Sequence, residues 1–331
     1  MDLRRLGSSD LTLTPVGLGT WAIGGGDWVL GWGPQTNADS VTTVRRAIDQ
    51  GINWIDTAAV YGLGQSETLI ARALREIPRI ERPYVFTTCS LVWDELGNVV
   101  HSLDPYSLRR EAEASLRRLD VDVIDLYQLG WPLWPKSPPD QNPESLEAAW
   151  DTLAELKREG KVRFIGVSNC DRDQLARLQR IAPVTSLQTR YSLLSRNVEA
   201  ETFPFCQSHD IGVLAYSPMH SGLLSGMMTA DRVNAMPHND WRRRSPHFQE
   251  PILSCALTLT DRLRTVAARY ARTAGEVAIA WTLRHPAVTA VAVGARRPDQ
   301  VDAMLGAGTL RLTTDDLKGF YLSCSLPDPP W

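Results

Sequence analysis

Polar and aromatic residues stand where several apolar runs of this chain end. The run "INWIDTAAVYG" carries Asp56 and Tyr61, and "VRFIGVSN" ends in Ser168 and Asn169. Similar positions in "SLQTRYS" and "GVLAYSP" hold Gln188, Tyr216, Ser217 and Pro218. Amides and hydroxyls of these types can hydrogen-bond a carboxamide, and Tyr216 offers an aromatic face for stacking. Any one of them could be an ordinary satisfied buried group, but their shared position predicts a site for a flat amide-bearing ring such as nicotinamide.

Two later segments have the composition of an anion site. "SPMHSGLLSG" supplies Gly222, Leu223 and Gly226, in a loop whose backbone N–H groups could wrap a pyrophosphate. "GARRPDQ" then places residues 294–297, with Arg296 and Arg297, just before a predicted helix that includes Gln300; a helix start favours anions. Arginines there suit a 2′-phosphate, which favours NADP(H) over NAD(H). A solvated arginine pair is the alternative.

These residues need a scaffold that brings strand ends together, and the chain has eight short apolar runs. They are "PVGLGTWAI", "INWIDTA", "YVFTTC", "VIDLYQL", "VRFIGVSN", "SLQTRYS", "GVLAYSP" and "VTAVAVGA". Helical patterns separate them, with start signals at Asp104-Pro105 and Asn142-Pro143 and a stop at Gly160. Strand and helix in alternation predict a parallel sheet. Eight units without a composition break favour a closed (β/α)8 TIM barrel, in one domain spanning 1–331.

The alternative, a doubly wound sheet, would need a dinucleotide fingerprint. "GLGTWAIGGG" is not GxGxxG, and "GLGQSE" lacks the third glycine, so we interpret both as turns that allow close backbone approach. "SSDLTLT" predicts an N-terminal hairpin that plugs the barrel bottom. The long connection after the seventh strand, 220–255, predicts a functional loop.

The overall composition excludes little. A net charge of −3, with 43% hydrophobic residues in 331, gives no signal for nucleic acid or a membrane partner. We find neither a signal peptide nor a membrane span, so we expect a cytoplasmic location. The cysteines lack metal-ligand spacing, which predicts no metal site and favours free, mostly buried thiols over disulfides. They are Cys89, Cys170, Cys206, Cys255 and Cys324.

Seven motifs together resemble the aldo-keto reductases over essentially the whole chain. They are "GLGTW", "GINWIDTAAVYGLGQSE", "SLRRLDVDVIDLYQL", "LKREGKVRFIGVSN", "YSLLSR", "GVLAYSPMHSGLLSG" and "VGARRPDQV", most similar to the bacterial branch related to Kv-beta and sugar reductases. The resemblance implies a barrel that binds NADPH without a Rossmann fold and reduces carbonyls by hydride transfer. It adds Thr20 and Trp21 to the cofactor site.

The same resemblance implies a catalytic tetrad of Asp, Tyr, Lys and His. The Asp corresponds to Asp56 and the Tyr to Tyr61, but the Lys position holds Thr88 in "VFTTCS" and the His position holds Gly130 in "DLYQLGWP". Without the cation, the carboxylate raises the pKa of the tyrosine above its usual 10 or so. We therefore expect Asp56 to be protonated, paired with an arginine or in contact with water, and Tyr61 to relay protons poorly. The tetrad is atypical.

The surroundings of Gly130 predict an altered substrate pocket. Gly130 leaves the volume of an imidazole empty, and "WPLWPKSPPDQNP" supplies Trp131 and Trp134, which suit an apolar or ring-bearing substrate beside Thr88. A stiff surface loop is the alternative. Candidates to replace the lost groups are Lys136, His220 and His101.

Three functions stay open. The first is an NADP(H)-dependent oxidoreductase that acts on a carbonyl or conjugated enone of a small or ring-bearing metabolite, and whose substrate supplies part of the missing activation. The second is a redox-neutral dehydratase, epimerase or isomerase. The third is a non-catalytic NADP(H)-binding protein. The oligomeric state is left unassigned.

Overall fold

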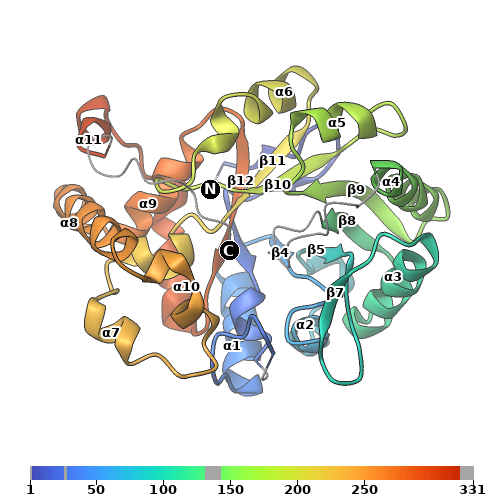
Figure 1. Ribbon diagram of the computed structural model, residues 1–331, viewed down its shortest axis with the longest axis horizontal. Helices are drawn as coiled ribbons and strands as arrows, with labels where there is room; N and C mark the ends of the chain where they lie inside the picture. The colour runs from blue at the N-terminus through green and yellow to red at the C-terminus, as the bar shows by residue number, and fades with distance from the viewer. Residues whose placement is uncertain (1, 26–27, 131–142, 321–331) are drawn as a thin grey trace.

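The computed structural model describes residues 2–25, 28–130 and 143–320, and its centre is a closed barrel of eight parallel strands (Figure 1). The strands are β3 (Val16–Gly19), β4 (Trp54–Asp56), β5 (Tyr84–Cys89), β8 (Ile124–Gly130), β9 (Val162–Ser168), β10 (Ser186–Arg190), β11 (Gly212–Tyr216) and β12 (Val288–Gly294). β12 pairs with β3 and closes the barrel, with Gly294 opposite Gly19. Each of the eight predicted runs overlaps one of these strands, and the TIM-barrel prediction is confirmed.

Helices surround the strands on the outside (Figure 1). They are α1 (Asn37–Asp49), α2 (Gln65–Leu74), α3 (Pro105–Leu119), α4 (Pro143–Arg158), α5 (Arg172–Leu178), α6 (Thr202–Ser208), α7 (Ala230–Asn234), α8 (Ile252–Arg269), α9 (Ala274–Leu283), α10 (Pro298–Leu305) and α11 (Thr314–Lys318). The Asp104 side chain accepts from Ser107 N and caps α3, whose first residue is Pro105. Gly160 follows α4 with φ 78°, as its predicted role as a stop requires. None of the helices in the described ranges is both long and apolar enough to cross a membrane.

An N-terminal hairpin of β1 (Arg4–Arg5) and β2 (Thr12–Leu13) fills one end of the barrel. Its Leu6, Leu11 and Leu13 are buried against residues inside the barrel, among them Trp54 and Phe86. The hairpin lies at the start of the strands, since a Cβ on Gly7 would come within 2.6 Å of Gly212 N. The predicted plug is confirmed, and the opposite end, where the strands finish, remains for the site.

The two glycine-rich segments are turns that approach each other. Gly62 has φ 60°, and a Cβ there would lie 2.2 Å from Gly24 O. A side chain at either position would therefore push apart the turns that follow β3 and β4. The prediction of close backbone approach is confirmed, and the partner of each turn is the other turn.

Two features were not predicted. A small antiparallel hairpin, β6 (Leu91–Trp93) with β7 (Val99–His101), follows β5. The connection after β11 contains short helices, including η4 (His220–Ser225), α7 and η5 (Trp241–Arg244).

The cysteine prediction was wrong in part. Cys89, Cys170 and Cys206 are buried free thiols, but Cys255 is disulfide-bonded. Cys324 lies outside the described residues. A disulfide depends on proximity in space, which spacing along the chain did not reveal.

Candidate active site

A cavity of about 1200 Å³ opens where the barrel strands end. The predicted residues that line it are Thr20, Trp21, Asp56, Tyr61, Thr88, Gly130, Ser168, Asn169, Gln188, Tyr216, Ser217, Pro218, Gly222, Gly226, Gly294, Arg296, Arg297 and Gln300. Leu223 is not among the lining residues, because its side chain is fully buried in an apolar cluster with Met228 and Phe248; its contact with a cofactor stays a prediction. Trp131, Trp134 and Lys136 lie outside the described residues. The other predicted residues named above lie around one cavity, as expected from their positions at the ends of parallel strands.

The deepest charged group of the cavity is the Asp56 carboxyl at the end of β4. It is 5% exposed, and its Oδ1 accepts hydrogen bonds from Gln188 Nε2 at 2.6 Å and Gln128 Nε2 at 3.3 Å. Burial raises the pKa of Asp56 to about 7, although the two amide hydrogen bonds oppose the rise. Both neighbours are neutral. Of the three states expected for this carboxyl, the structure therefore favours the protonated one near and below neutral pH, and it does not show an arginine partner.

The residues predicted to hold an amide-bearing ring come together on one wall. The Tyr216 hydroxyl donates to Asn169 Oδ1 at 3.0 Å, and Ser168 lies at the end of the neighbouring strand β9. Asn169 has φ 63°, a left-handed conformation that turns its side chain away from the strand direction. The Ser168 hydroxyl and the Asn169 amide can hydrogen-bond a carboxamide, and the Tyr216 ring can stack on the planar ring that carries it.

The other end of the cavity is rich in positive charge. Consecutive residues His220, Ser221 and Gly222 have φ values of 47°, 55° and 96°, so their loop is wound in the left-handed region. Arginines that line this end are Arg232, Arg242, Arg264, Arg272, Arg296 and Arg297. The only carboxylates among the described lining residues are Asp39, Asp56 and Asp299. This distribution fits an elongated ligand with a neutral ring at one end and phosphates at the other.

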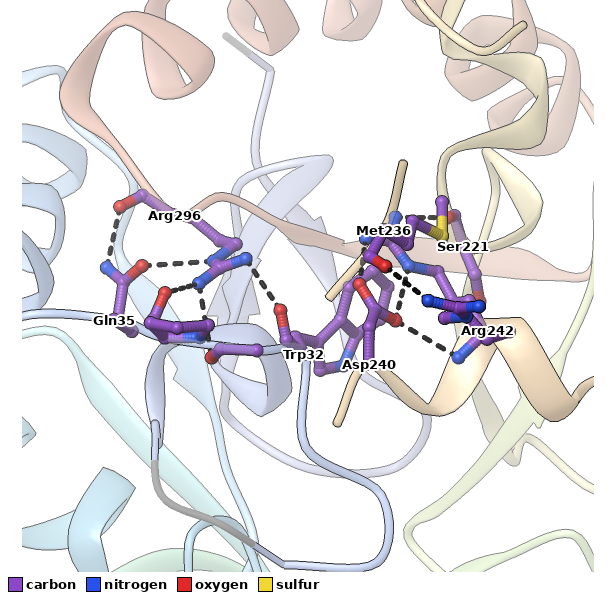
Figure 2. A network of polar contacts seen from close by, with 10 residues as sticks. Trp32, Gln35, Ser221, Met236, Asp240, Arg242 and Arg296 are labelled. Atoms are coloured by element: carbon purple, nitrogen blue, oxygen red, sulfur yellow. Dashed lines mark hydrogen bonds and ion pairs between the residues drawn. The ribbon is translucent and has the colours of Figure 1, made fainter. Parts of the chain in front are cut away.

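Three segments far apart in sequence join at the rim, and Figure 2 shows this network. Trp32 forms an antiparallel bridge with Asp240, and Arg242 pairs with Asp240 at 2.6 Å while lying 4.5 Å from the Trp32 ring. Arg296 donates to the backbone oxygens of Trp32, at 2.8 Å, and of Pro34. The segment 28–35 is therefore tied to η5 on one side and to the loop after β12 on the other. We call this segment the strap.

Comparison with known proteins identifies the family. The family model described as aldo/keto reductase family matches residues 15–320. The chain belongs to the aldo/keto reductase family. It is 35% identical over 327 residues to an Escherichia coli protein named NADH-specific methylglyoxal reductase, covering 94% of each chain. It is 32% identical to the Bacillus subtilis aldo-keto reductase YhdN, with 99% of this chain and 96% of that protein covered.

Solved structures agree with this assignment. A glycerol dehydrogenase from Gluconobacter oxydans superposes with a TM-score of 0.83 at 35% identity, covering 96% of this chain and 94% of that one. An aldo-keto reductase from Bacillus halodurans, in its holo form, gives a TM-score of 0.75 at 26% identity, covering 97% and 95%. Fold and sequence therefore identify the same aldo/keto reductase family.

The positions at which we expect the reductase lysine and histidine have their own geometry. Thr88 accepts a hydrogen bond from Gln128 Nε2 at 3.4 Å, so one amide serves both Thr88 and Asp56. Tyr61 stacks at 6.2 Å on Trp21, with the ring planes 20° apart. Burial, and next the Asp56 carboxylate, raise the pKa of the Tyr61 phenol well above its usual value. The structure therefore gives the upward shift in the pKa of Tyr61 that we expected from the sequence.

Gly130 does not leave the volume of an imidazole, which corrects the expectation of a deeper pocket there. A Cβ on Gly130 would lie 2.8 Å from Ser90 Oγ and 2.9 Å from Cys89 O. Ser90 Oγ donates to Gly130 O at 2.6 Å, and the His101 ring lies 3.1 Å from the same oxygen. The Ser90 side chain and the Cys89 carbonyl occupy the space that a Cβ would need.

Neither described candidate for a replacement group reaches Asp56. His220 is buried, with its Nε2 2.8 Å from His247 Nδ1 and its Nδ1 3.2 Å from Ser192 Oγ. His101 belongs to β7 and contacts the backbone at Gly130. These imidazoles lie outside the set of lining residues.

Sequence reasoning missed the aromatic rim. Trp28, Trp32 and Trp241 line the cavity, and Trp21 stacks on Trp241 at 5.1 Å. Their signal was the density of tryptophan in "GDWVLGWG" and "NDWRRR", two segments that otherwise have the composition of loops. Tryptophan is costly to expose, so such a concentration in loops points to a binding surface.

Proposed function

We propose that the chain is a nicotinamide-dependent oxidoreductase that acts on a carbonyl group or conjugated enone of a small or ring-bearing metabolite. The observation that carries this proposal is the single cavity, with an amide-bearing wall at one end and arginines at the other. The relatives support it, because one is named a methylglyoxal reductase and another a glycerol dehydrogenase. When bound, a dihydronicotinamide supplies a hydride.

In this proposal the protein orients the ring and excludes water. Asn169 and Ser168 hold the carboxamide, and Tyr216 packs on the ring. The strap covers the ligand, since it joins η5 and the loop after β12. Asp56 and Tyr61 face the reacting atoms, and Trp21 with Trp241 forms an apolar wall for the substrate.

We propose NADP(H) as a cofactor, with weak discrimination against NAD(H). Both arginines that suggested a 2′-phosphate have partners. Arg296 donates to the strap, at Gln35 Oε1 and Trp32 O, and Arg297 pairs with Asp299 at 3.0 Å. The Arg297–Asp299 pair is exposed. Replacing the Asp299 carboxylate by a ligand phosphate as the partner of Arg297 therefore changes the free energy of binding by at most about 1 kcal/mol. The Escherichia coli relative is named NADH-specific. We therefore expect the two dissociation constants to agree within about tenfold.

Fluorescence titration tests both parts of this proposal. Tryptophan emission should be quenched by NADPH and by NADH, because Trp21 and Trp241 line the cavity. A preference for one cofactor above about 100-fold would overturn the weak-discrimination proposal. Absence of binding at millimolar cofactor would overturn the enzymatic proposal as a whole. Arg297→Met is the matched variant, and it should weaken NADPH but leave NADH binding unchanged.

A redox-neutral enzyme is the second candidate, and the environment of Tyr61 favours it. A phenol whose pKa is raised is a weak proton donor to a carbonyl at neutral pH. An isomerase, epimerase or dehydratase would convert substrate with no net change in cofactor absorbance at 340 nm. Net oxidation of NADPH by aldehydes, ketones or enones would decide for the oxidoreductase, and cofactor binding without any turnover would leave a binding protein.

A further inference from the structure

The Asp56 carboxyl is a buried acid beside which residues 2–25, 28–130 and 143–320 place no cation. The causes that set its pKa are burial and the hydrogen bonds from Gln188 and Gln128, and no arginine, lysine or histidine is among them. The same holds for Tyr61, on which burial, Asp56 and Tyr216 act. A carboxylate in such a place is costly unless something positive lies beside it. The next residue on the neighbouring strand that faces it, Thr88, is short and neutral.

Neutral carbonyl substrates fit this arrangement poorly. Hydride addition to C=O leaves an alkoxide, which needs a proton donor or a cation as the charge develops. Tyr61 is the acidic group at hand, and its raised pKa makes it a weak donor. A substrate that is already cationic at the reacting group needs neither. A lysine beside it would repel it, so the absence of a cation near Asp56 suits such a substrate.

We propose that the preferred substrate of this cavity is a protonated imine, a C=N–H⁺ group whose N–H donates to Asp56. This inference rests on the proposed oxidoreductase function and differs from it in the reducible group, a protonated C=N in place of the carbonyl or enone. The Asp56 carboxylate is the counter-ion that keeps the imine protonated inside the cavity. The faces of Trp21 and Tyr61 add a favourable surface for a delocalised cation.

The reaction balances without a proton relay. The iminium carbon gains a hydride from the dihydronicotinamide, forming a C–H bond. The π pair of the C=N bond becomes the lone pair of the amine nitrogen, which keeps its N–H. The substrate is reduced by two electrons and the cofactor is oxidised to its cationic form, so the total charge is unchanged. Protonation of the released amine then takes place in solvent.

A lysine substitution at Thr88 gives opposite expectations for the two substrate classes. The probes are 3,4-dihydroisoquinoline, a cyclic imine, and 1-tetralone, a neutral ketone of similar shape, each with NADPH and with NADH. Thr88→Met matches lysine in length without its charge. Relative to Thr88→Met, Thr88→Lys should lower kcat/KM for the imine by about 100-fold or more, since a like charge now faces the substrate. It should raise kcat/KM for the ketone about tenfold.

A binding measurement provides a readout besides turnover. Tetrahydroisoquinolinium is an inert cation, and isochroman is its neutral isostere. By calorimetry with cofactor present, the wild-type protein should bind the cation at least about tenfold more tightly than isochroman. Because Asp56 has a pKa of about 7, binding at pH 6 should release close to one proton, and at pH 8.5 almost none. Asp56→Asn should remove both the preference and the proton release.

The outcomes separate this inference from the function on which it rests. Turnover of the ketone but not of the imine would overturn the imine proposal and leave the oxidoreductase. Equal effects of Thr88→Lys and Thr88→Met on imine turnover would also overturn it, since charge would then not matter. Absence of cofactor binding would overturn both proposals. Circular dichroism and urea unfolding of each variant show that it is folded before it is compared.

Discussion

Two buried carboxylates lie on either side of β5, and they differ in their hydrogen-bond partners. Glu67, in α2, is fully buried, and it accepts from Arg118 Nε at 2.6 Å and from Thr87 Oγ1 at 2.7 Å. Asp56 is almost as buried, but it accepts only from two amides. Thr87 faces the first acid and Thr88 the second. Glu67, which lies between a helix and the barrel, has a guanidinium beside it, whereas Asp56 at the cavity has no cation beside it among the described residues.

Removing the cation from Glu67 should have the largest effect. Arg118→Met leaves a carboxylate unpaired in the interior, and we expect a loss of about 4 to 5 kcal/mol in the free energy of unfolding. Urea denaturation at pH 7.5 measures it. Arg79→Met is the control, because Arg79 and its partner Asp122 are both about three-quarters exposed, so that change should cost at most about 1 kcal/mol. Equal losses in the two variants would mean that Glu67 does not need its arginine.

Removing the charge from Asp56 should stabilise the protein, and increasingly so at higher pH. The folded-state pKa of Asp56 is about 7, against 3.8 for the ordinary group, so the folded state binds more protons between these values. Wild-type stability therefore falls as pH rises from about 4 to about 7. Asp56→Asn has no carboxyl at this position, so its stability should not fall for this reason over the same pH range. Its gain should be near zero at pH 4 and approach about 4 kcal/mol at pH 8, since each pKa unit is worth about 1.4 kcal/mol.

The control for that prediction is Asp240→Asn. Asp240 is as buried as Asp56 but is paired with Arg242, so its amide should destabilise the protein. Glu111, whose pKa burial also raises to about 7, titrates in both variants and cancels from the comparison with wild type. A pH-independent difference between Asp56→Asn and wild type would show that this carboxyl is not perturbed.

The adjacent threonines should give the smallest but cleanest contrast. Thr87→Val removes the hydroxyl that donates to buried Glu67, and we expect a cost of about 1 to 2 kcal/mol in unfolding free energy. Thr88→Val removes only a 3.4 Å acceptor of Gln128 and should change stability by less than about 0.5 kcal/mol. Differential scanning calorimetry of both proteins measures this. Similar costs would break the distinction between the two faces of β5.

The barrel was predictable because its signals are local and repeated. Each predicted run overlaps one strand, and Asp104 and Gly160 mark helix ends through their own backbone preferences. The β6–β7 hairpin was missed because its residues are only partly buried, which leaves no alternation between apolar and polar positions to detect.

The site was predictable as a set of strand ends but not as a network. Asp56, Ser168 and Gln188 were found together because parallel strands end on the same side. That Gln128 donates to Asp56, or that the Ser90 side chain and the Cys89 carbonyl fill the space beside Gly130, depends on the strand register across the barrel and on small shifts in atomic position. The direction of the Leu223 side chain was likewise not predictable, since the local winding of its loop decides which side chains face the cavity.

The closure of the barrel has a consequence for how the protein is made. The first barrel strand, β3, finds one of its two neighbours only when β12 has been synthesised, more than 250 residues later. The contacts of the strap also form late, because Arg296 donates to the backbone oxygen of Trp32. A growing chain therefore carries an unpaired strand edge until β12 has been made. Binding of a cofactor in the cavity would then report that β12 and Arg296 have reached their places, because a product that ends before them lacks part of the rim.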